Sequence, residues 1–248
     1  MRTALIALTA LVLPCVVSSQ QVKNYPLESA AGLRLHNVAA EAATLDGKRG
    51  VRLTVSPDLT RRLQTLTPEQ QQQLAQRGTI DGVDLEQLAV IEGPDFSSGV
   101  IEAEIAGAPA ADAGVGARGF VGIAFRVQPD VKTYDAFYLR PTNGRADDQE
   151  RRNHATQYIS HPDWPWFRLR QETPGRYESY VDLLPNVWTK IKIEVRGDHA
   201  RLYVNDNPQP VLIVNDVKTG ATARGSVALW IGPGTIAHFR TVTVTPGQ

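Results

Sequence analysis

The chain is dominated by short runs in which apolar and polar residues alternate, and turn sequences separate one run from the next. In residues 120–127, for example, Val121, Ile123 and Phe125 share one face of an extended strand. Turn signals such as Asp46-Gly47 bound these runs. Many short strands with closely spaced turns and little helix are typical of a two-sheet antiparallel sandwich. We therefore predict an all-β jelly roll.

The same alternation predicts where the strands lie. Residues 33–38 and 50–55 are expected to pair as antiparallel strands around the Asp46-Gly47 turn, and residues 107–116, rich in Ala and Gly, indicate a loop. The other expected strands cover residues 87–91, 99–105, 120–127, 134–140, 177–184, 188–195, 200–204, 211–214, 225–231 and 238–244.

One segment departs from the β pattern. Thr67 is placed to cap a helix, Pro68 suits its first position, and Gln70 completes a capping box. A glutamine run continues the helix, and a glycine ends it. We expect residues 57–82 to be an insertion with a short helix near residues 67–77 that covers a sheet edge.

The N-terminus has the composition of a secretory signal peptide, residues 1–19. It combines a positive start, an apolar run too short to span a bilayer, and small residues before cleavage after Ser19. Cys15, the only cysteine, lies in this segment, and Pro14 precedes it where a lipid-attachment site needs a small residue. We expect a cleaved chain rather than a lipoprotein, secreted or periplasmic, with residues 20–248 as a single domain free of disulfides.

The charge balance excludes some functions. Lys and Arg together number 26, Asp and Glu also number 26, and the pI is about 7.0. A neutral chain gives no electrostatic reason to expect binding to nucleic acid or to an anionic membrane surface. After the N-terminus no apolar run is long enough to span a bilayer.

The most polar segment, residues 134–170, mixes charged side chains with Trp and Tyr. Aromatic faces cover the apolar C–H surface of a sugar, and ions and amides bind its hydroxyl groups. This composition indicates a binding face for a polar, hydroxyl-rich ligand. The candidate ligand-binding residues are Arg126, Tyr138, Arg140, Asn143, Arg145, Arg152, Tyr158, Trp164, Trp166 and Arg168. Of these, Arg126, Tyr138 and Arg140 are expected on one sheet face.

The tryptophans leave alternatives open. Trp164 and Trp166 flank a proline. Either one ring stacks on a sugar while the other anchors the loop, or both rings anchor the loop. Trp230 shares a face with Ser226 and Ala228, and it either lies on the ligand side of the sheet or caps the core.

Four residues are candidate catalytic acids or bases: Asp147, Asp148, His154 and His161. Together with Glu150, the two aspartates also offer oxygen ligands for Ca²⁺, although neighbouring arginines make an ion-paired, solvated loop the competing interpretation. The chain carries neither the H-E-x-x-H zinc motif nor the G-x-S-x-G nucleophile motif. The identity of any metal stays open.

Five segments resemble the strands of the concanavalin A-like lectin/glucanase jelly roll. They are the opening strand with Phe96 and Glu102, residues 119–126, the laminin-G-like hairpin of residues 188–205, and the closing strands at residues 225–232 and 239–244. The order of elements is similar to that superfamily from residue 33 to residue 244. Within it, the chain most resembles the 3-keto-disaccharide hydrolase domain group of secreted bacterial proteins, which implies a role with oxidised sugars.

The resemblance does not extend to the glycoside hydrolase family 16 glucanases. Those enzymes place their carboxylates as E-x-D-x-x-E on one strand, whereas Glu102-Ala-Glu104 stops short of that motif. The sequence therefore favours a secreted carbohydrate-binding domain that holds a glycan or glycoside on its concave sheet and adjoining polar loop. The alternatives are a hydrolase or lyase of 3-keto-glycosides that uses a general base with Arg or a metal, and a laminin-G-like protein-interaction module.

Overall fold

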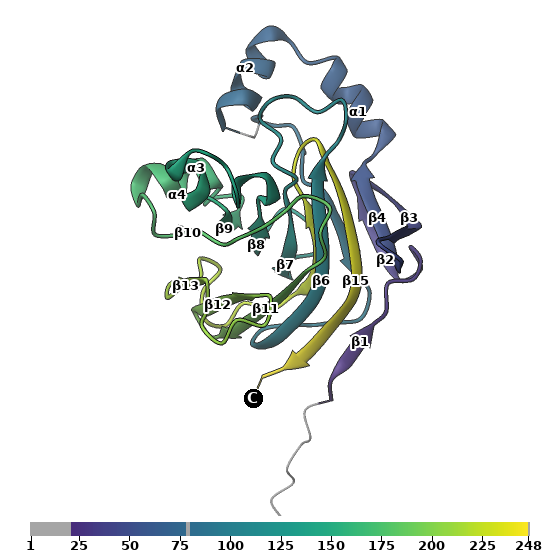
Figure 1. The fold of residues 1–248 in the computed structure, drawn as a ribbon, viewed down its shortest axis with the longest axis vertical. Coiled ribbons are helices and arrows are strands. Elements are labelled where there is room, and N and C mark those ends of the chain that lie inside the picture. The colour runs from purple at the N-terminus through teal and green to yellow at the C-terminus, as the bar shows by residue number, and fades with distance from the viewer. Residues whose placement is uncertain (1–20, 78–79, 248) are drawn as a thin grey trace, which may run out of the picture.

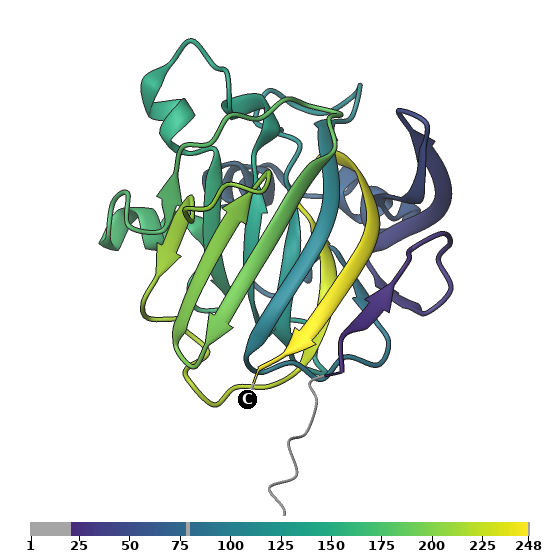
Figure 2. The same cartoon turned by 60° about the horizontal axis from the view of Figure 1, so that its bottom comes forward.

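The computed structural model describes residues 21–77 and 80–247. In this part of the chain two antiparallel sheets pack face to face, which confirms the all-β sandwich (Figure 1). Figure 2, turned by 60°, shows the strands of one sheet side by side across the front of the molecule. The expected signal peptide lies outside the described residues. None of the described helices is long and apolar enough to cross a membrane.

The larger sheet has eight strands. Seven follow the order β13-β12-β11-β6-β15-β4-β3, and β1 pairs with the far end of β15. Their bounds are β13 Leu212–Val214, β12 His199–Val204, β11 Thr189–Arg196, β6 Gly99–Pro109, β15 Thr235–Pro246, β4 Lys48–Val55, β3 Val38–Leu45 and β1 Lys23–Tyr25.

The smaller sheet has seven strands in the order β10-β9-β8-β7-β14-β5-β2. Their bounds are β10 Glu178–Ser179, β9 Thr156–His161, β8 Tyr134–Leu139, β7 Val121–Val127, β14 Ser226–Ile231, β5 Leu88–Ile91 and β2 Leu33–His36. Sequential strands β7, β8 and β9 are neighbours, so the polar segment of residues 134–170 is held at one side of this sheet.

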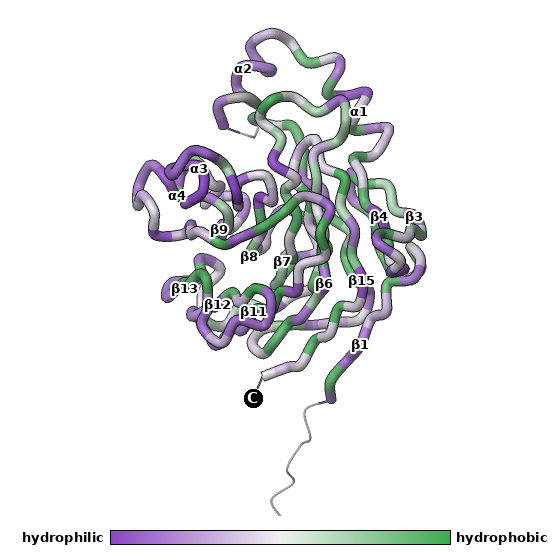
Figure 3. The backbone as a smooth tube through the Cα atoms, in the orientation of Figure 1, coloured by the Kyte–Doolittle hydropathy of each residue, from purple (hydrophilic) through white to green (hydrophobic). Residues whose placement is uncertain are grey.

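The core fills the space between the sheets. Phe125 of β7 stacks on Phe137 of β8, with ring centroids 6.2 Å apart, and Phe96 meets Phe125 edge to face. Ile193 of β11 and Phe239 of β15 are fully buried on the larger sheet. Each such side chain contributes roughly 1.5–3 kcal/mol on burial. Figure 3 shows the hydrophobic colouring concentrated in the strands and the hydrophilic colouring in α2, α3 and α4.

The helical insertion contains two helices, α1 Pro57–Gln64 and α2 Pro68–Arg77. The expected capping box of α2 is present, because the Gln70 amide donates to the Thr67 hydroxyl over 3.3 Å and the Thr67 amide donates to the Gln70 side chain over 3.0 Å. Helix α1 was not predicted from the sequence, although Ser56 accepts a hydrogen bond from the Leu59 amide in the same capping geometry.

The strand predictions need three corrections. Strand β4 pairs with β3, which begins at Val38, whereas residues 33–36 form β2 and pair with β5. Residues 107–109 extend β6 rather than opening a loop. The expected strand at residues 177–184 is reduced to β10, whereas β9 was hidden inside the polar segment. In each case tertiary pairing decided the conformation rather than local composition.

Candidate functional site

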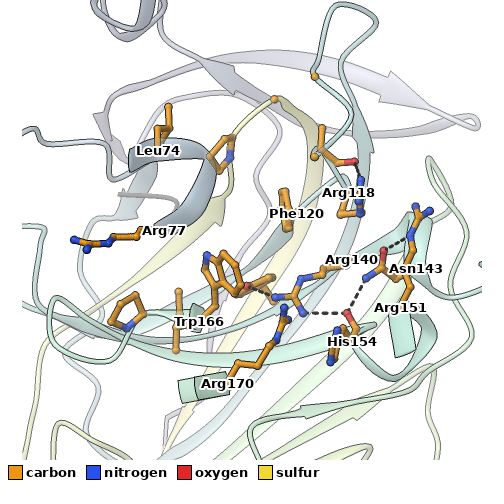
Figure 4. A pocket seen from close by; sticks show the side chains of 18 of the residues that line it. Leu74, Arg77, Arg118, Phe120, Arg140, Asn143, Arg151, His154, Trp166 and Arg170 are labelled. Atoms are coloured by element: carbon orange, nitrogen blue, oxygen red, sulfur yellow. Dashed lines mark hydrogen bonds between the residues drawn. The ribbon is translucent and has the colours of Figure 1, made fainter. Parts of the chain in front are cut away.

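A cavity of about 860 Å³ opens on the face of the seven-stranded sheet that is turned away from the core (Figure 4). Strands β8, β9 and β14 supply its floor. Leu74 and Arg77 of α2 border it on one side, and the loop with Arg118 borders another. Helices α3 Gln149–Asn153 and α4 Trp166–Glu172 and the short turn η1 Pro141–Asn143 also contribute.

The floor is an aromatic stack. Tyr138 of β8 and Trp230 of β14 lie with their ring centroids 4.6 Å apart and 25° between planes. Gly122 of β7 pairs with both residues and separates the two strands, and a Cβ atom there would lie 2.2 Å from the Phe137 carbonyl oxygen. Because Gly122 has no side chain, the two rings meet above it. Phe120 then packs edge to face on Tyr138, 6.0 Å away.

Beneath the cavity Arg140 forms the centre of a hydrogen-bond network. Its guanidinium donates to Glu178 Oε1 over 3.1 Å, to the Tyr138 hydroxyl over 2.9 Å and to Gln157 Oε1 over 3.0 Å. It also donates to the His154 carbonyl oxygen over 3.0 Å. The side chain is only 6% exposed, so its orientation is fixed before any ligand arrives.

Glu178 of β10 is shared by two arginines. Arg170 of α4 binds it with two donors, Nε to Oε2 over 2.9 Å and Nη2 to Oε1, while His154 Nε2 lies 3.5 Å from Oε2. Burial acts to raise the pKa of Glu178, but the Arg170 hydrogen bonds and the charge of Arg140 outweigh it and hold the pKa below its ordinary value. Burial also lowers the pKa of His154, which favours the neutral ring.

One tryptophan of the pair lines the cavity, and the other does not. Trp166 borders the cavity at the start of α4, with the Arg170 guanidinium 4.9 Å from its ring centroid. Trp164 lies outside the cavity between two cations, Arg168 at 3.9 Å and Lys218 at 4.5 Å, and bonds through its backbone to Ser160. The structure therefore places one ring of the pair at the cavity and the other between two cations outside it.

His161 lies at the end of β9 and borders the same cavity. Its Nδ1 lies 2.8 Å from Glu86 Oε1, and its ring stacks on Tyr134 with centroids 5.1 Å apart. The Tyr134 hydroxyl donates to Glu86 Oε2 and accepts from Trp230 Nε1 over 3.1 Å. This chain of bonds fixes the imidazole through one nitrogen and leaves Nε2 without a protein partner among the described residues.

Asn143 and Asp148 meet the cavity at the η1–α3 corner. The Asn143 amide donates to the His154 carbonyl oxygen and accepts from Arg151 Nε, both over 3.0 Å. Asp148 is the N-cap of α3 and accepts from the Arg151 amide over 2.7 Å. Asp148 therefore lies at the rim of the cavity, and its carboxylate already accepts the hydrogen bond that caps α3.

Arg126 is a correction, because it does not join Tyr138 and Arg140 at the cavity. The pairing of β7 with β14 shifts register near this residue, and its φ of 56° breaks the alternation of faces. The guanidinium is fully buried and donates to the carbonyl oxygens of Ser97, Gly197 and Gly220. Arg126 therefore holds loops together and is not accessible to a ligand.

Other candidates also lie elsewhere. Tyr158 faces the core, fully buried, and donates to Asp135 Oδ1 over 2.6 Å. Arg145 pairs with Asp182 on the surface. The remaining candidates outside the cavity lining are Arg152, Arg168 and Asp147. Of the sequence candidates, the cavity brings together Tyr138, Arg140, Asn143, Asp148, His154, His161 and Trp166.

The expected Ca²⁺ ligands do not converge. Within residues 21–77 and 80–247, no three His, Cys, Asp or Glu side chains form a group that is able to hold a metal ion. Asp148 and Glu150 border the cavity, but Asp147 does not. The competing interpretation of this loop, a solvated segment with ion pairs, fits Arg145 and Asp182.

Several cavity residues were missed. No sequence pattern indicated Arg170 or Glu178, because their hydrogen-bonded ion pair joins a helix to a two-residue strand that only the fold brings together. The alternation of β9 was available as a signal, because it places His161 on the face opposite Tyr158. Trp230 borders the cavity, although its side chain is largely buried. The missed lining residues with larger side chains are Leu74, Arg77, Arg118, Phe120, Arg151, Ile159 and Arg170.

The arrangement combines three chemical properties. Aromatic rings offer flat apolar surface, fixed guanidinium groups donate hydrogen bonds, and one imidazole is oriented by a carboxylate. These properties together suit a polar ring compound that carries both apolar and hydroxyl-bearing surface. The orientation of His161 also provides a base for proton transfer.

Comparison with known proteins identifies the fold. No protein-family model matches the chain, and no curated protein matches it. A carbohydrate-binding module, CBM66 from Bacillus subtilis, superposes with a TM-score of 0.55 at 13% identity, covering 89% of this chain and 100% of the module. This likeness confirms the jelly-roll fold of the concanavalin A-like and galectin-like type.

Two further solved structures are similar at lower scores. A galectin-like protein of unknown function from Bacillus subtilis has a TM-score of 0.48 at 13% identity, with 90% of this chain and 94% of that chain covered. A glycosyl hydrolase-like protein from Parabacteroides distasonis has a TM-score of 0.49 at 8% identity, with 91% and 100% covered.

Proposed function

We propose that this protein is a carbohydrate-recognition domain that binds a glycan or glycoside in the cavity of the seven-stranded sheet. The observation that carries the proposal is the shared lining of the cavity. Trp166 borders the cavity, the stacked rings of Tyr138 and Trp230, 3% and 8% exposed, form its floor, and Arg140 and Arg170 hold fixed positions beside them. Sugar rings match this combination because they carry C–H patches and hydroxyl groups on the same ring.

The size and the fold support the proposal. A cavity of about 860 Å³ falls within the range typical of small-molecule sites, which is roughly 300–1,000 Å³. The similar structure from Bacillus subtilis is a carbohydrate-binding module, and it covers nearly the whole chain. Fold alone does not fix function, so the side chains in the cavity carry the inference.

Titration of the protein with a panel of glycans tests this proposal, using isothermal calorimetry on the wild type and on Trp166→Ala. Loss of the ring removes aromatic contact of roughly 1–2 kcal/mol, which weakens binding about five- to thirtyfold. The matched control is Tyr180→Ala, because Tyr180 is an exposed aromatic residue outside the cavity. Unchanged affinity in a folded Trp166→Ala variant, or no binding of any glycan, refutes the proposal.

A second candidate function rests on the His161–Glu86 contact of 2.8 Å. In a 3-keto-glycoside the ketone acidifies the proton on C2. His161 Nε2 takes this proton, the electrons form an enolate that a guanidinium stabilises, and the C1–O bond breaks as the aglycone leaves with the electron pair. The resemblance to 3-keto-disaccharide hydrolases points to this substrate.

Product formation separates the enzyme from the binding domain. The second candidate predicts turnover of a 3-keto-glycoside, no turnover of the unoxidised glycoside, and strong loss on His161→Gln. Glu86→Gln is expected to lower turnover as well, since Glu86 orients the ring. Binding of a 3-keto-glycoside without any product refutes the enzymatic candidate and leaves the binding function intact.

The N-terminal sequence supports export of the protein. We infer that residues 1–19 are removed and that the chain acts outside the cytoplasm, secreted or periplasmic. Mass spectrometry of the protein recovered from a bacterial host's periplasm and medium tests this inference. An N-terminus at Gln20 agrees with it, and an uncleaved or lipid-modified chain contradicts it.

A further inference from the structure

Positive charge exceeds negative charge around the cavity. Five guanidinium groups border it, those of Arg77, Arg118, Arg140, Arg151 and Arg170. The carboxylates that face them are Asp148 and Glu150 at the rim and Glu178 beneath Arg140 and Arg170. Glu86 is bonded to His161 and Tyr134. Since Glu178 already serves two arginines, the remaining cations have few carboxylates to balance them.

Arg118 is the cation with the clearest spare capacity. Its Nη1 donates to the carbonyl oxygens of Val115 over 2.6 Å and Ala117 over 3.0 Å, and no carboxylate pairs with it in the part of the chain that the structure describes. Burial and the charges of Arg151 and Arg140 lower its pKa, as expected for a cation among cations. Nε and Nη2 of Arg118 make no hydrogen bond to the described part of the chain.

Arg151 lies beside Arg118 at the η1 turn. Both contact Thr142: the Arg118 carbonyl oxygen accepts from the Thr142 amide over 3.3 Å, and Arg151 Nη2 donates to the Thr142 hydroxyl over 3.2 Å. The Nε of Arg151 is held by Asn143 over 3.0 Å. Figure 4 shows Arg118 above Arg140, with Asn143 and Arg151 next to them. We call Arg118 and Arg151 the arginine corner.

The rim carboxylates do not neutralise this corner. Asp148 uses Oδ1 to accept from the Arg151 amide, and no ion pair joins either Asp148 or Glu150 to an arginine of the corner among the described residues. On the opposite side, burial acts to lower the pKa of Arg170, but its hydrogen bond and charge interaction with Glu178 raise it above the ordinary value, and Glu150 adds a smaller effect in the same direction. The arginine corner therefore keeps an unbalanced positive charge that faces the cavity.

We propose that the ligand of the cavity is an acidic saccharide, whose carboxylate or sulfate group binds at the arginine corner while a sugar ring lies against Trp166 and the Tyr138–Trp230 stack. This inference rests on the proposed carbohydrate binding. The planar fork of a guanidinium matches two oxygens of a carboxylate or sulfate, and partial burial strengthens such a charge-assisted bond. A neutral glycan leaves these donors without a charged partner.

Calorimetric titration with matched pairs of oligosaccharides tests the inference. Each uronic-acid oligosaccharide is compared with its carboxyl-reduced, neutral product, and each sulfated oligosaccharide with its desulfated product, so that the two acidic groups are distinguished. We expect the acidic member of at least one pair to bind about tenfold or more tightly, in line with a charged hydrogen bond. This difference in affinity should become smaller as the salt concentration is raised.

Substitution localises the effect. Arg118→Gln and Arg151→Gln should each lower the affinity for the acidic member much more than the affinity for its neutral partner, and so remove most of the preference, with circular dichroism confirming the fold. Arg145→Gln is the matched control, because Arg145 is exposed, pairs with Asp182 and lies outside the cavity. It should preserve the preference.

The outcomes separate the two proposals. Equal binding within every pair, or equal loss in Arg145→Gln and Arg118→Gln, overturns the acidic ligand but leaves carbohydrate binding standing. Failure of every saccharide to bind overturns carbohydrate recognition and the acidic ligand together.

Discussion

Glu178→Gln tests the reasoning about the buried network beneath the cavity. The Glu178 side chain is 2% exposed and that of Arg140 is 6% exposed, and Arg170 adds two further bonds to the same carboxylate. Breaking a buried pair of this kind costs about 3–5 kcal/mol. Because glutamine keeps one acceptor oxygen, we expect a loss of about 2–4 kcal/mol in the free energy of unfolding.

Thermal and urea unfolding measure this loss. For a chain of this size each kcal/mol moves the Tm by roughly 2–4 °C, so the variant should melt about 5–15 °C below the wild type at pH 7. Glu172→Gln is the control, since Glu172 pairs with Arg168 on the surface of α4 with about half of each side chain exposed. Its expected loss is below about 0.5 kcal/mol.

The pH dependence gives a second readout. The pKa of Glu178 is lowered in the folded protein, so its charge stabilises the fold above the ordinary glutamate value of 4.5 and this contribution is lost as the pH falls toward the folded pKa. The difference in the free energy of unfolding between the wild type and Glu178→Gln should therefore become smaller below pH 4.5. A variant as stable as the wild type at pH 7, or a gap that is constant with pH, refutes the account of the network.

Two further substitutions test the corrected positions on β7. Arg126→Lys should lower the free energy of unfolding by about 3 kcal/mol, because lysine cannot bond the three loop carbonyls together. The glycan affinity of the folded protein should stay unchanged. A loss of affinity without a loss of stability would return Arg126 to the binding site. Gly122→Ala should lower the free energy of unfolding by about 1–3 kcal/mol and also weaken glycan binding, because the methyl group would press between β7 and β8 under the Tyr138–Trp230 stack. Urea unfolding and calorimetry measure these two effects. A variant as stable as the wild type would contradict the role given to Gly122.

The sequence predicts the sandwich well, because alternation of apolar and polar residues is a local property that burial of one sheet face enforces. The alternation of faces along β8 and into Arg140 follows this rule, and so Tyr138 and Arg140 were expected on one face, where both border the cavity. Arg126 shows where the rule fails. One bulge shifts the register of β7 against β14, and no local signal in the sequence marks it.

The cavity was predicted only in part, for a related reason. The composition of residues 134–170 indicated a polar binding segment, but it did not say which side chains point inward. Arg170 and Glu178 meet only because α4 folds against β9 and β10, and Arg118 reaches the site from a loop far away in the chain. Arg145 and Arg152 lie in the same polar segment as the cavity residues, yet their side chains contact Asp182 and Tyr180 on the surface.

The most direct test of the central claim follows the indole N–H signals of the tryptophans by NMR during titration with a glycan. The chain has four tryptophans, and single Trp→Phe variants assign their signals. We predict that Trp166 and Trp230 shift as the cavity fills, whereas Trp188, whose Nε1 donates to the Leu45 carbonyl oxygen on the other sheet, does not. Saturable binding that shifts Trp188 and leaves Trp166 unchanged would contradict the cavity as the carbohydrate site.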